Sequence, residues 1–345
     1  MRKIVNTRIK EFIKLISPAE IRGLVPVSDE AADNIVKGRE EFCRILHGED
    51  GRFAVIAGPC SIHDPGAALE YAVKLKGLAD KYGDKLYLIM RVYFEKPRTT
   101  VGWKGLINDP GMNESYDMEA GLKTARKLLG DINGLGMPVA TELLDPIISA
   151  YIAELVSWAA IGARTTESQT HRQMASGLSA PVGFKNNSDG NLDVAVNAMQ
   201  SAIKPHNFLG IDNDGRSCIL HTIGNGDVHI VLRGGKGRPN YHLEDIEECE
   251  GKLQAAGFEP RIMVDCSHEN SGKNHKKQGI VIRDIIAQKR QGNKSIFGVM
   301  LESNLCEGSQ KAEEGKNLKY GVSITDACIG WEETEDLLKE LYENL

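Results

Sequence analysis

Eight reactive or charged side chains stand at, or just after, the ends of short apolar runs in this sequence. They are Cys60, Arg91, Glu142, Arg164, Lys185, Arg233, His268 and Glu302. Taken singly, an arginine in such a position is usually a solvated loop charge, and a cysteine is usually a buried structural thiol. A reactive group after every run is improbable by chance, so the set predicts one shared functional site.

One part of the set is cationic. The chain carries a formal net charge of −6, so positive charge gathered in one place indicates a strongly anionic ligand. Arginine suits bidentate binding of phosphate or carboxylate, and lysine supplies a point charge that can also donate a proton. This group comprises Arg91, Lys96, Arg98, Arg164, Lys185 and Arg233.

The other part consists of Cys60, His268, Glu302 and Asp326. One thiolate, one imidazole and two carboxylates suit a divalent transition metal such as Mn²⁺, Fe²⁺, Co²⁺ or Zn²⁺, and this mixture of soft and hard donors leaves the identity of the metal open. A zincin helix is excluded, because Gly272 stands where the second histidine of HExxH would be.

The elements that must position these residues follow from the apolar runs, which alternate with helical patterns. Nearly continuous apolar strands separated by helices indicate a parallel sheet buried on both faces. Eight such units predict an α/β fold of the (β/α)8 TIM-barrel type, in which all the strand ends face one mouth. A doubly wound sheet is disfavoured, because neither GxGxxG nor GxxxxGK[ST] occurs. The runs are 53–58, 86–93, 138–144, 158–164, 181–185, 229–233, 261–265 and 296–302.

Two additions to the barrel are expected. Residues 1–50 form an N-terminal arm, with one helix over Ile9 to Ile16 that ends at Ser17-Pro18 and a second from about Ser28 to Ile45. Residues 51–345 form the barrel domain, with an inserted β-hairpin at about 206–223.

Composition excludes several classes of protein. The 345 residues are 41% hydrophobic and 26% charged, as in an ordinary globular protein. We expect no nucleic-acid partner, because the acidic chain has no overall positive field that would attract one. We also expect no membrane partner and a cytoplasmic location, because the sequence shows neither a signal peptide nor an apolar span long enough to cross a bilayer. Seven scattered cysteines without a CxxC pair argue against a disulfide framework.

The motifs that contain these residues resemble those of the 3-deoxy-D-arabino-heptulosonate-7-phosphate (DAHP) synthases, in order and over nearly the whole chain. They resemble in particular the type I, feedback-inhibited microbial group. The matching segments are 58–63 (GPCSIH), 91–105 (RVYFEKPRTTVGWKG), 162–169 (GARTTESQ), 183–186 (GFKN), 232–235 (LRGG), 265–268 (DCSH), 302–303 (ES) and 323–328 (SITDAC).

The resemblance implies a condensation of phosphoenolpyruvate with erythrose 4-phosphate and a role for each residue. Cys60, His268, Glu302 and Asp326 would bind the metal, and Lys96, with Cys60 and His268, would belong to the catalytic set. Arg98 and Thr99 would bind the phosphate of erythrose 4-phosphate. The phosphoenolpyruvate site would comprise Arg91, Lys96, Ala163, Arg164, Lys185 and Arg233.

The resemblance also implies a homodimer or homotetramer and an aromatic amino acid inhibitor bound near Ser149, Leu178, Ser179 and Gly210. Gly210 stands where phenylalanine-sensitive forms have serine, and the smaller residue favours tyrosine as the inhibitor. Cys328, two residues after Asp326, is expected to form a disulfide with Cys60 on oxidation. Two other functions stay open: a 3-deoxy-D-manno-octulosonate-8-phosphate synthase and a non-catalytic sugar-phosphate sensor.

Overall fold

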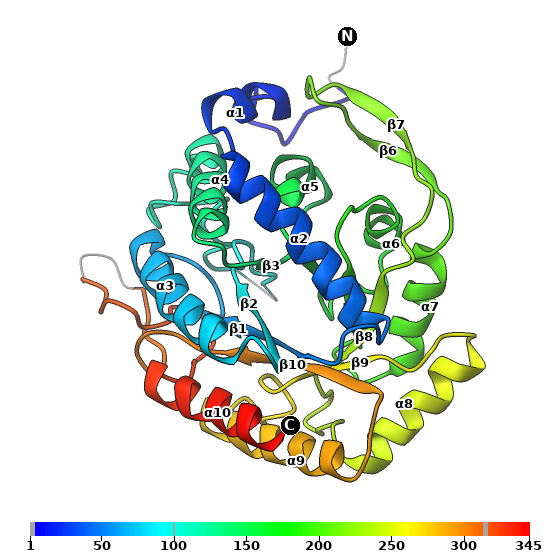
Figure 1. The fold of residues 1–345 in the computed structure, drawn as a ribbon. Helices are drawn as coiled ribbons and strands as arrows, with labels where there is room; N and C mark the ends of the chain where they lie inside the picture. Colours follow the sequence, from blue (N-terminus) through cyan, green and yellow to red (C-terminus); the bar gives the residue numbers. More distant parts are fainter. Residues whose placement is uncertain (1–3, 99–100, 313–316) are drawn as a thin grey trace.

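Eight parallel strands close into a barrel in the computed structural model, which describes residues 4–98, 101–312 and 317–345 (Figure 1). Around the barrel the strand order is β1-β10-β9-β8-β5-β4-β3-β2, and every strand residue is buried. The predicted (β/α)8 fold is therefore confirmed. The strands are β1 (Phe53–Gly58), β2 (Leu86–Arg91), β3 (Val139–Glu142), β4 (Trp158–Ile161), β5 (Val182–Lys185), β8 (Val228–Leu232), β9 (Ile262–Asp265) and β10 (Ile296–Glu302).

A ring of helices covers the outside of the barrel (Figure 1). Several begin where a polar side chain accepts a hydrogen bond from the first turn, as Asp64, Asp117, Asp145 and Asn191 do. The ring comprises α3 (Pro65–Tyr82), α4 (Met118–Gly134), α5 (Pro146–Ile152), η1 (Ala153–Leu155), α6 (Gln169–Ala175), α7 (Leu192–Ala202), α8 (Leu243–Ala255), η2 (His275–Lys277), α9 (Gln278–Arg290) and α10 (Trp331–Asn344).

The N-terminal segment contains α1 (Pro18–Leu24) and α2 (Asp29–Leu46). Helix α2 lies across the amino-terminal end of the barrel, where Phe42 packs 6.4 Å from the ring of Trp158 and 5.9 Å from that of Phe297. The second predicted helix of the arm is thus confirmed, with Ser28 as its cap.

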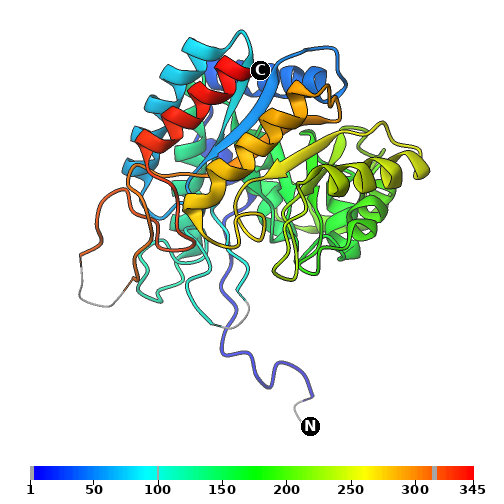
Figure 2. The same cartoon turned by 90° about the horizontal axis from the view of Figure 1, so that it is seen from below.

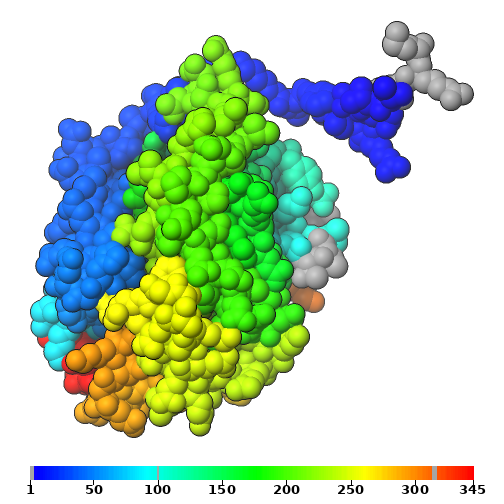
Figure 3. All heavy atoms as spheres, turned by 90° about the vertical axis from the view of Figure 1, so that its right-hand side faces the viewer, coloured from blue at the N-terminus to red at the C-terminus, as the bar shows by residue number. Residues whose placement is uncertain are grey.

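The first predicted helix of the arm is wrong. The described residues before Pro18 form no helix, and residues 4–13 run away from the body of the molecule (Figure 3). Ile9, Phe12 and Ile13 are 50%, 76% and 82% exposed, so a short amphipathic helix there has no apolar surface to pack against. Ser17-Pro18 starts a helix instead, because Ser17 forms a capping box with Glu20 and Pro18 occupies the first turn.

The inserted hairpin is present as predicted. Strands β6 (Asn207–Ile211) and β7 (Ser217–His221) pair in antiparallel register, separately from the barrel. The hairpin tip contacts α1, since the amide of Ala19 donates to the carbonyl of Asn213 at 2.8 Å. None of the described helices is both long and apolar enough to cross a membrane.

Candidate active site

The carboxyl ends of the barrel strands bring the predicted residues to one mouth. Arg91, Glu142, Lys185 and Glu302 are the last residues of β2, β3, β5 and β10. The loops that follow β2 and β10 extend from this same end of the barrel (Figure 2). A cavity of about 210 Å³ lies here, lined by Arg91, Lys96, Pro97, Arg98, Glu142, Ala163, Arg164, Lys185, Ser188, Arg233, His268 and Asp326.

All six residues predicted to bind phosphoenolpyruvate therefore line one cavity. Arg98, predicted to bind erythrose 4-phosphate, lines it as well, whereas Thr99 lies outside the described residues. The hydrogen bond from Arg164 to the carbonyl of Pro97, at 2.8 Å, ties the loop after β4 to the loop after β2. Within the latter loop, Arg98 donates to the carbonyl of Trp103 at 2.8 Å.

Three of the four predicted metal ligands meet beside this cavity. Ligand atoms of Cys60, Glu302 and Asp326 all lie within 4.8 Å of one another, and the Cys60 sulfur lies 3.4 Å from Asp326 Oδ2. His268 stands at the edge of this group, with Nε2 3.9 Å from Glu302 Oε1. One sulfur, two carboxylates and an imidazole fit a divalent transition metal.

The imidazole of His268 is held by residues on its far side. Nδ1 lies 2.9 Å from Asp265 Oδ2 and 2.8 Å from the Ser267 hydroxyl, so Nε2 is the nitrogen left facing Glu302. A carboxylate behind the imidazole is the usual support of a metal-binding histidine. His268 also has a φ of 53°, and a strained backbone of this kind is common at functional sites.

Asp265 is a site residue that the sequence reasoning missed. Its carboxylate joins His268 to Lys185, whose ammonium lies 2.9 Å away in a buried ion pair. Burial alone would raise the pKa of Asp265, but His268 and Lys185 hold it well below its usual range. The available signal was an acidic residue at the end of an otherwise apolar strand, three residues before His268.

Lys96 and Arg91 neutralise the anionic cluster. The Lys96 ammonium lies 3.0 Å from the Cys60 sulfur and 3.7 Å from Asp326 Oδ2. Arg91 is buried and lies 3.1 Å from Glu302 Oε1, with its guanidinium carbon 3.6 Å above the ring of Tyr93. Burial opposes the charge on Lys96, yet Cys60, Glu302 and Asp326 raise the pKa of this lysine above its usual value.

The Cys60 thiol is fully buried. Burial, followed by the charge of Glu302, raises the pKa of this thiol to about 12, although the positive charge of Lys96 partly lowers it. A thiol with this pKa is protonated at neutral pH, so binding a metal there must release its proton.

A second cavity, of about 520 Å³, lies between α5, α6 and the hairpin. Ser149, Leu178, Ser179 and Gly210, the four residues predicted to bind an inhibitor, all line it. It is separate from the cavity at the strand ends. Its walls include Phe208 and Leu220 of the hairpin.

The comparisons with known proteins agree with this arrangement. Residues 25–339 match the profile of the DAHP synthetase I family. The Tyr-sensitive and Phe-sensitive phospho-2-dehydro-3-deoxyheptonate aldolases of Escherichia coli K12 are each 53% identical, over 99% and 97% of this chain and 96% of each relative. The solved structure of such an aldolase from Francisella tularensis SCHU S4 is 48% identical, with a TM-score of 0.95 over 97% of this chain and 98% of that one. The chain thus belongs to the DAHP synthetase I family.

Proposed function

We propose that this protein is a DAHP synthase, which joins phosphoenolpyruvate to erythrose 4-phosphate at the start of aromatic amino acid biosynthesis. C3 of phosphoenolpyruvate attacks the aldehyde carbon, water adds at C2, and phosphate leaves with cleavage of its C–O bond. The main support is the convergence of the cationic side chains and the metal-type cluster at one mouth. Two mutually repelling anions need such a lining to be held in register.

Each cation has a place in this proposal. Arg164 and Arg233 bind the phosphate of phosphoenolpyruvate, with a further contact from the backbone of Ala163, and Lys185 faces its carboxylate. Arg91 lines the same cavity, also pairs with Glu302, and is proposed to bind phosphoenolpyruvate as well. Arg98 and Thr99 bind the phosphate of erythrose 4-phosphate.

Lys96 is the proposed acid for the new hydroxyl group. Its ammonium lies beside the sulfur of Cys60, and Lys96 also lines the substrate cavity, so the ammonium can reach a bound substrate as well as the metal cluster. Glu142 lines the same cavity and is proposed to orient the attacking water.

A divalent metal completes the site, and Mn²⁺ is the ion that we favour. Cys60, His268, Glu302 and Asp326 would hold it. A metal here supplies polarisation of the aldehyde oxygen or orientation of the attacking water.

Phosphate release from phosphoenolpyruvate tests this function. We expect release that depends on erythrose 4-phosphate, stops with EDTA and returns with Mn²⁺. A preference for arabinose 5-phosphate would instead identify a 3-deoxy-D-manno-octulosonate-8-phosphate synthase. Phosphate binding without turnover, with any metal, would identify a sensor.

We further propose tyrosine as a feedback inhibitor, bound in the cavity beside the hairpin. Relatives named Tyr-sensitive and Phe-sensitive are equally similar, at 53% identity, so the proposal rests on Gly210. A Cβ added there would lie 2.5 Å from Leu220 Cδ1, so a larger residue would displace Leu220, which also lines the cavity. Tyrosine should inhibit the parent and inhibit Gly210→Ser more weakly. Inhibition by phenylalanine but not by tyrosine contradicts the proposal.

The arm of residues 1–50 is proposed to join copies of the chain into a cytoplasmic homodimer or homotetramer, beside a catalytic domain of residues 51–345. The exposed side chains of Phe12 and Ile13 support this role. Light scattering should show a smaller assembly for Phe12→Ser/Ile13→Ser than for the parent. An unchanged mass would exclude these side chains from the interface.

A further inference from the structure

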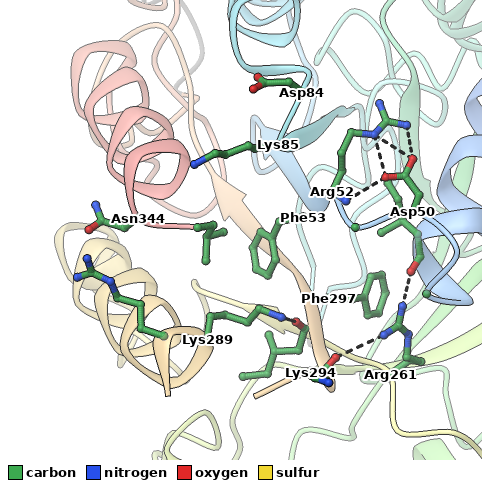
Figure 4. A pocket seen from close by; sticks show the side chains of 16 residues that line it. Asp50, Arg52, Phe53, Asp84, Lys85, Arg261, Lys289, Lys294, Phe297 and Asn344 are labelled. Atoms are coloured by element: carbon green, nitrogen blue, oxygen red, sulfur yellow. Dashed lines mark hydrogen bonds and ion pairs between the residues drawn. The ribbon is translucent and has the colours of Figure 1, made fainter. Parts of the chain in front are cut away.

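A third cavity lies at the amino-terminal end of the barrel, opposite the mouth that carries the active-site residues (Figure 4). Its volume is about 530 Å³, which lies within the range of small-molecule sites. Phe53 and Ile296, the first residues of β1 and β10, line it, and these strands end at the other mouth. Nothing in the proposed reaction uses this end of the molecule.

Positive charge dominates the lining. The acidic side chains in it are those of Asp50 and Asp84, and Asp50 is paired with Arg52 at 2.7 Å. Across the described ranges, the other five cations of the lining form no ion pair. The six cationic side chains are Arg52, Lys85, Arg261, Lys289, Arg290 and Lys294.

Backbone carbonyls hold three of these cations in place without neutralising them. Lys85 donates to the carbonyl of Tyr342 at 3.1 Å, and Lys289 donates to that of Ile296 at 2.9 Å. Arg261 donates to the carbonyls of Ile45 and Leu46. An ammonium has three N–H donors, so each lysine can still bind an anion.

Local packing explains only part of this cluster. Arg261 closes the carboxyl end of α2, and Lys289 and Arg290 lie in the last turn of α9, where positive charge favours the helix dipole. Lys85 likewise donates to a carbonyl in the last turn of α10, that of Tyr342, whereas Lys294 has neither role and completes the group of six cations. Their convergence in a chain of net charge −6 therefore indicates an anionic ligand.

Two cations of this cavity, Lys289 and Arg261, repel each other. Burial, together with the charge of Arg261, lowers the pKa of Lys289. An anion bound beside this half-buried ammonium would offset both effects.

The remaining walls are apolar and aromatic. Phe53 and Phe297 stand at the base of the cavity, and in Figure 4 the ring of Phe53 lies between the side chains of Lys85 and Lys289. The ammonium of Lys289 is 5.9 Å from the centre of that ring. Protein covers most of both rings, which are 5% and 4% exposed, and the part that lines the cavity would contact the apolar body of an organic anion but not an inorganic ion.

We propose that this cavity binds a small organic phosphate, whose phosphate group contacts Lys289 and Lys294 and whose carbon body packs on Phe53. Several converging cations favour a dianion over a single carboxylate. The site is distinct from the one that holds phosphoenolpyruvate, since the barrel separates the two cavities.

The test uses 4-fluorophenyl phosphate as the probe and fluorine NMR as the readout, on the metal-loaded full chain. The background variant Arg164→Ala/Arg233→Ala removes the two arginines proposed to bind phosphate at the other mouth, so the probe is kept from that site. We expect binding that persists under these conditions and weakens at least about tenfold in Lys289→Gln/Lys294→Gln, as for the loss of charged hydrogen bonds. Inorganic phosphate should compete less well than the probe.

The matched control is Lys127→Gln/Lys339→Gln, which removes the same charge from exposed lysines of α4 and α10. It should bind the probe as the parent does. Lys294→Glu, at an exposed position, tests the site without disturbing the buried wall. Equal binding by all the lysine variants, or loss of binding on Arg164→Ala/Arg233→Ala, overturns the proposal. Equal affinity for inorganic phosphate would overturn the part that concerns the organic body.

Discussion

The ammonium of Lys96 lies 3.0 Å from the sulfur of Cys60, so a proton donor stands beside the proposed metal ligand. Each group shifts the pKa of the other. The lysine opposes the burial that keeps the thiol protonated, and the cluster around the thiol keeps the lysine charged.

Replacement of Lys96 by methionine should abolish most of the activity. The variant loses a proton donor and a substrate cation, and loss of a general acid costs about 10²- to 10⁴-fold in rate. Steady-state kinetics with both substrates measures this, and Lys127→Met, at an exposed site on α4, is the control. A kcat close to that of the parent would remove Lys96 from the proposed chemistry.

Asp265→Asn should weaken metal binding by about 10- to 100-fold, because the imidazole of His268 loses the carboxylate that orients it. Competition with a chelator measures the affinity directly, independently of turnover. Ser267→Ala removes only the second contact to Nδ1, and its effect should be smaller. Equal metal affinity in Asp265→Asn and the parent would show that Asp265 serves only the ion pair with Lys185.

Oxidation of the metal-free enzyme should form a disulfide between Cys60 and Cys328 and inactivate the protein. Burial, with the nearby Cys60, holds the pKa of Cys328 well above its usual range, so both thiols are neutral at pH 7. Because the thiolate is the reacting form, the oxidation rate should rise by up to about tenfold per pH unit. Mass spectrometry detects the bond. Complete inactivation of oxidised Cys328→Ser would contradict this pairing.

Acid should destabilise the barrel through His229. The indole of Trp158 donates to Nε2 of this buried histidine at 2.9 Å, so the ring is neutral, and burial lowers its pKa to about 4. In the unfolded chain the pKa is about 6.5, so the stabilisation is complete above that pH and disappears as the pH falls towards 4.

Between pH 7 and pH 4.5 this histidine should account for about 2–3 kcal/mol of the loss in unfolding free energy. Urea titrations of the parent and of His229→Phe at both pH values measure it. The variant is expected to be less stable at pH 7, since Trp158 loses its acceptor, but it should lose less stability on acidification. Equal losses in both proteins would exclude His229 as the acid-sensitive group.

The sequence by itself determined the barrel and most of its mouth. Strands buried on both faces must be apolar along their whole length, so β1 and β10 were visible as continuous runs. Because parallel strands end on one side, Arg91, Lys185 and Glu302 could be placed together without coordinates.

The tertiary structure alone decided what depends on contacts between distant segments. Asp265 joins Lys185 to His268, and its partner Lys185 lies 80 positions away, so its place at the end of an apolar strand could not show which groups it connects. The spacing of Ile9, Phe12 and Ile13 suggested a helix, but a short helix forms only where its apolar face finds a surface, which spacing cannot show. Lys85, Lys289 and Lys294 form a cationic cavity for the same reason: only the closure of the barrel brings their segments together.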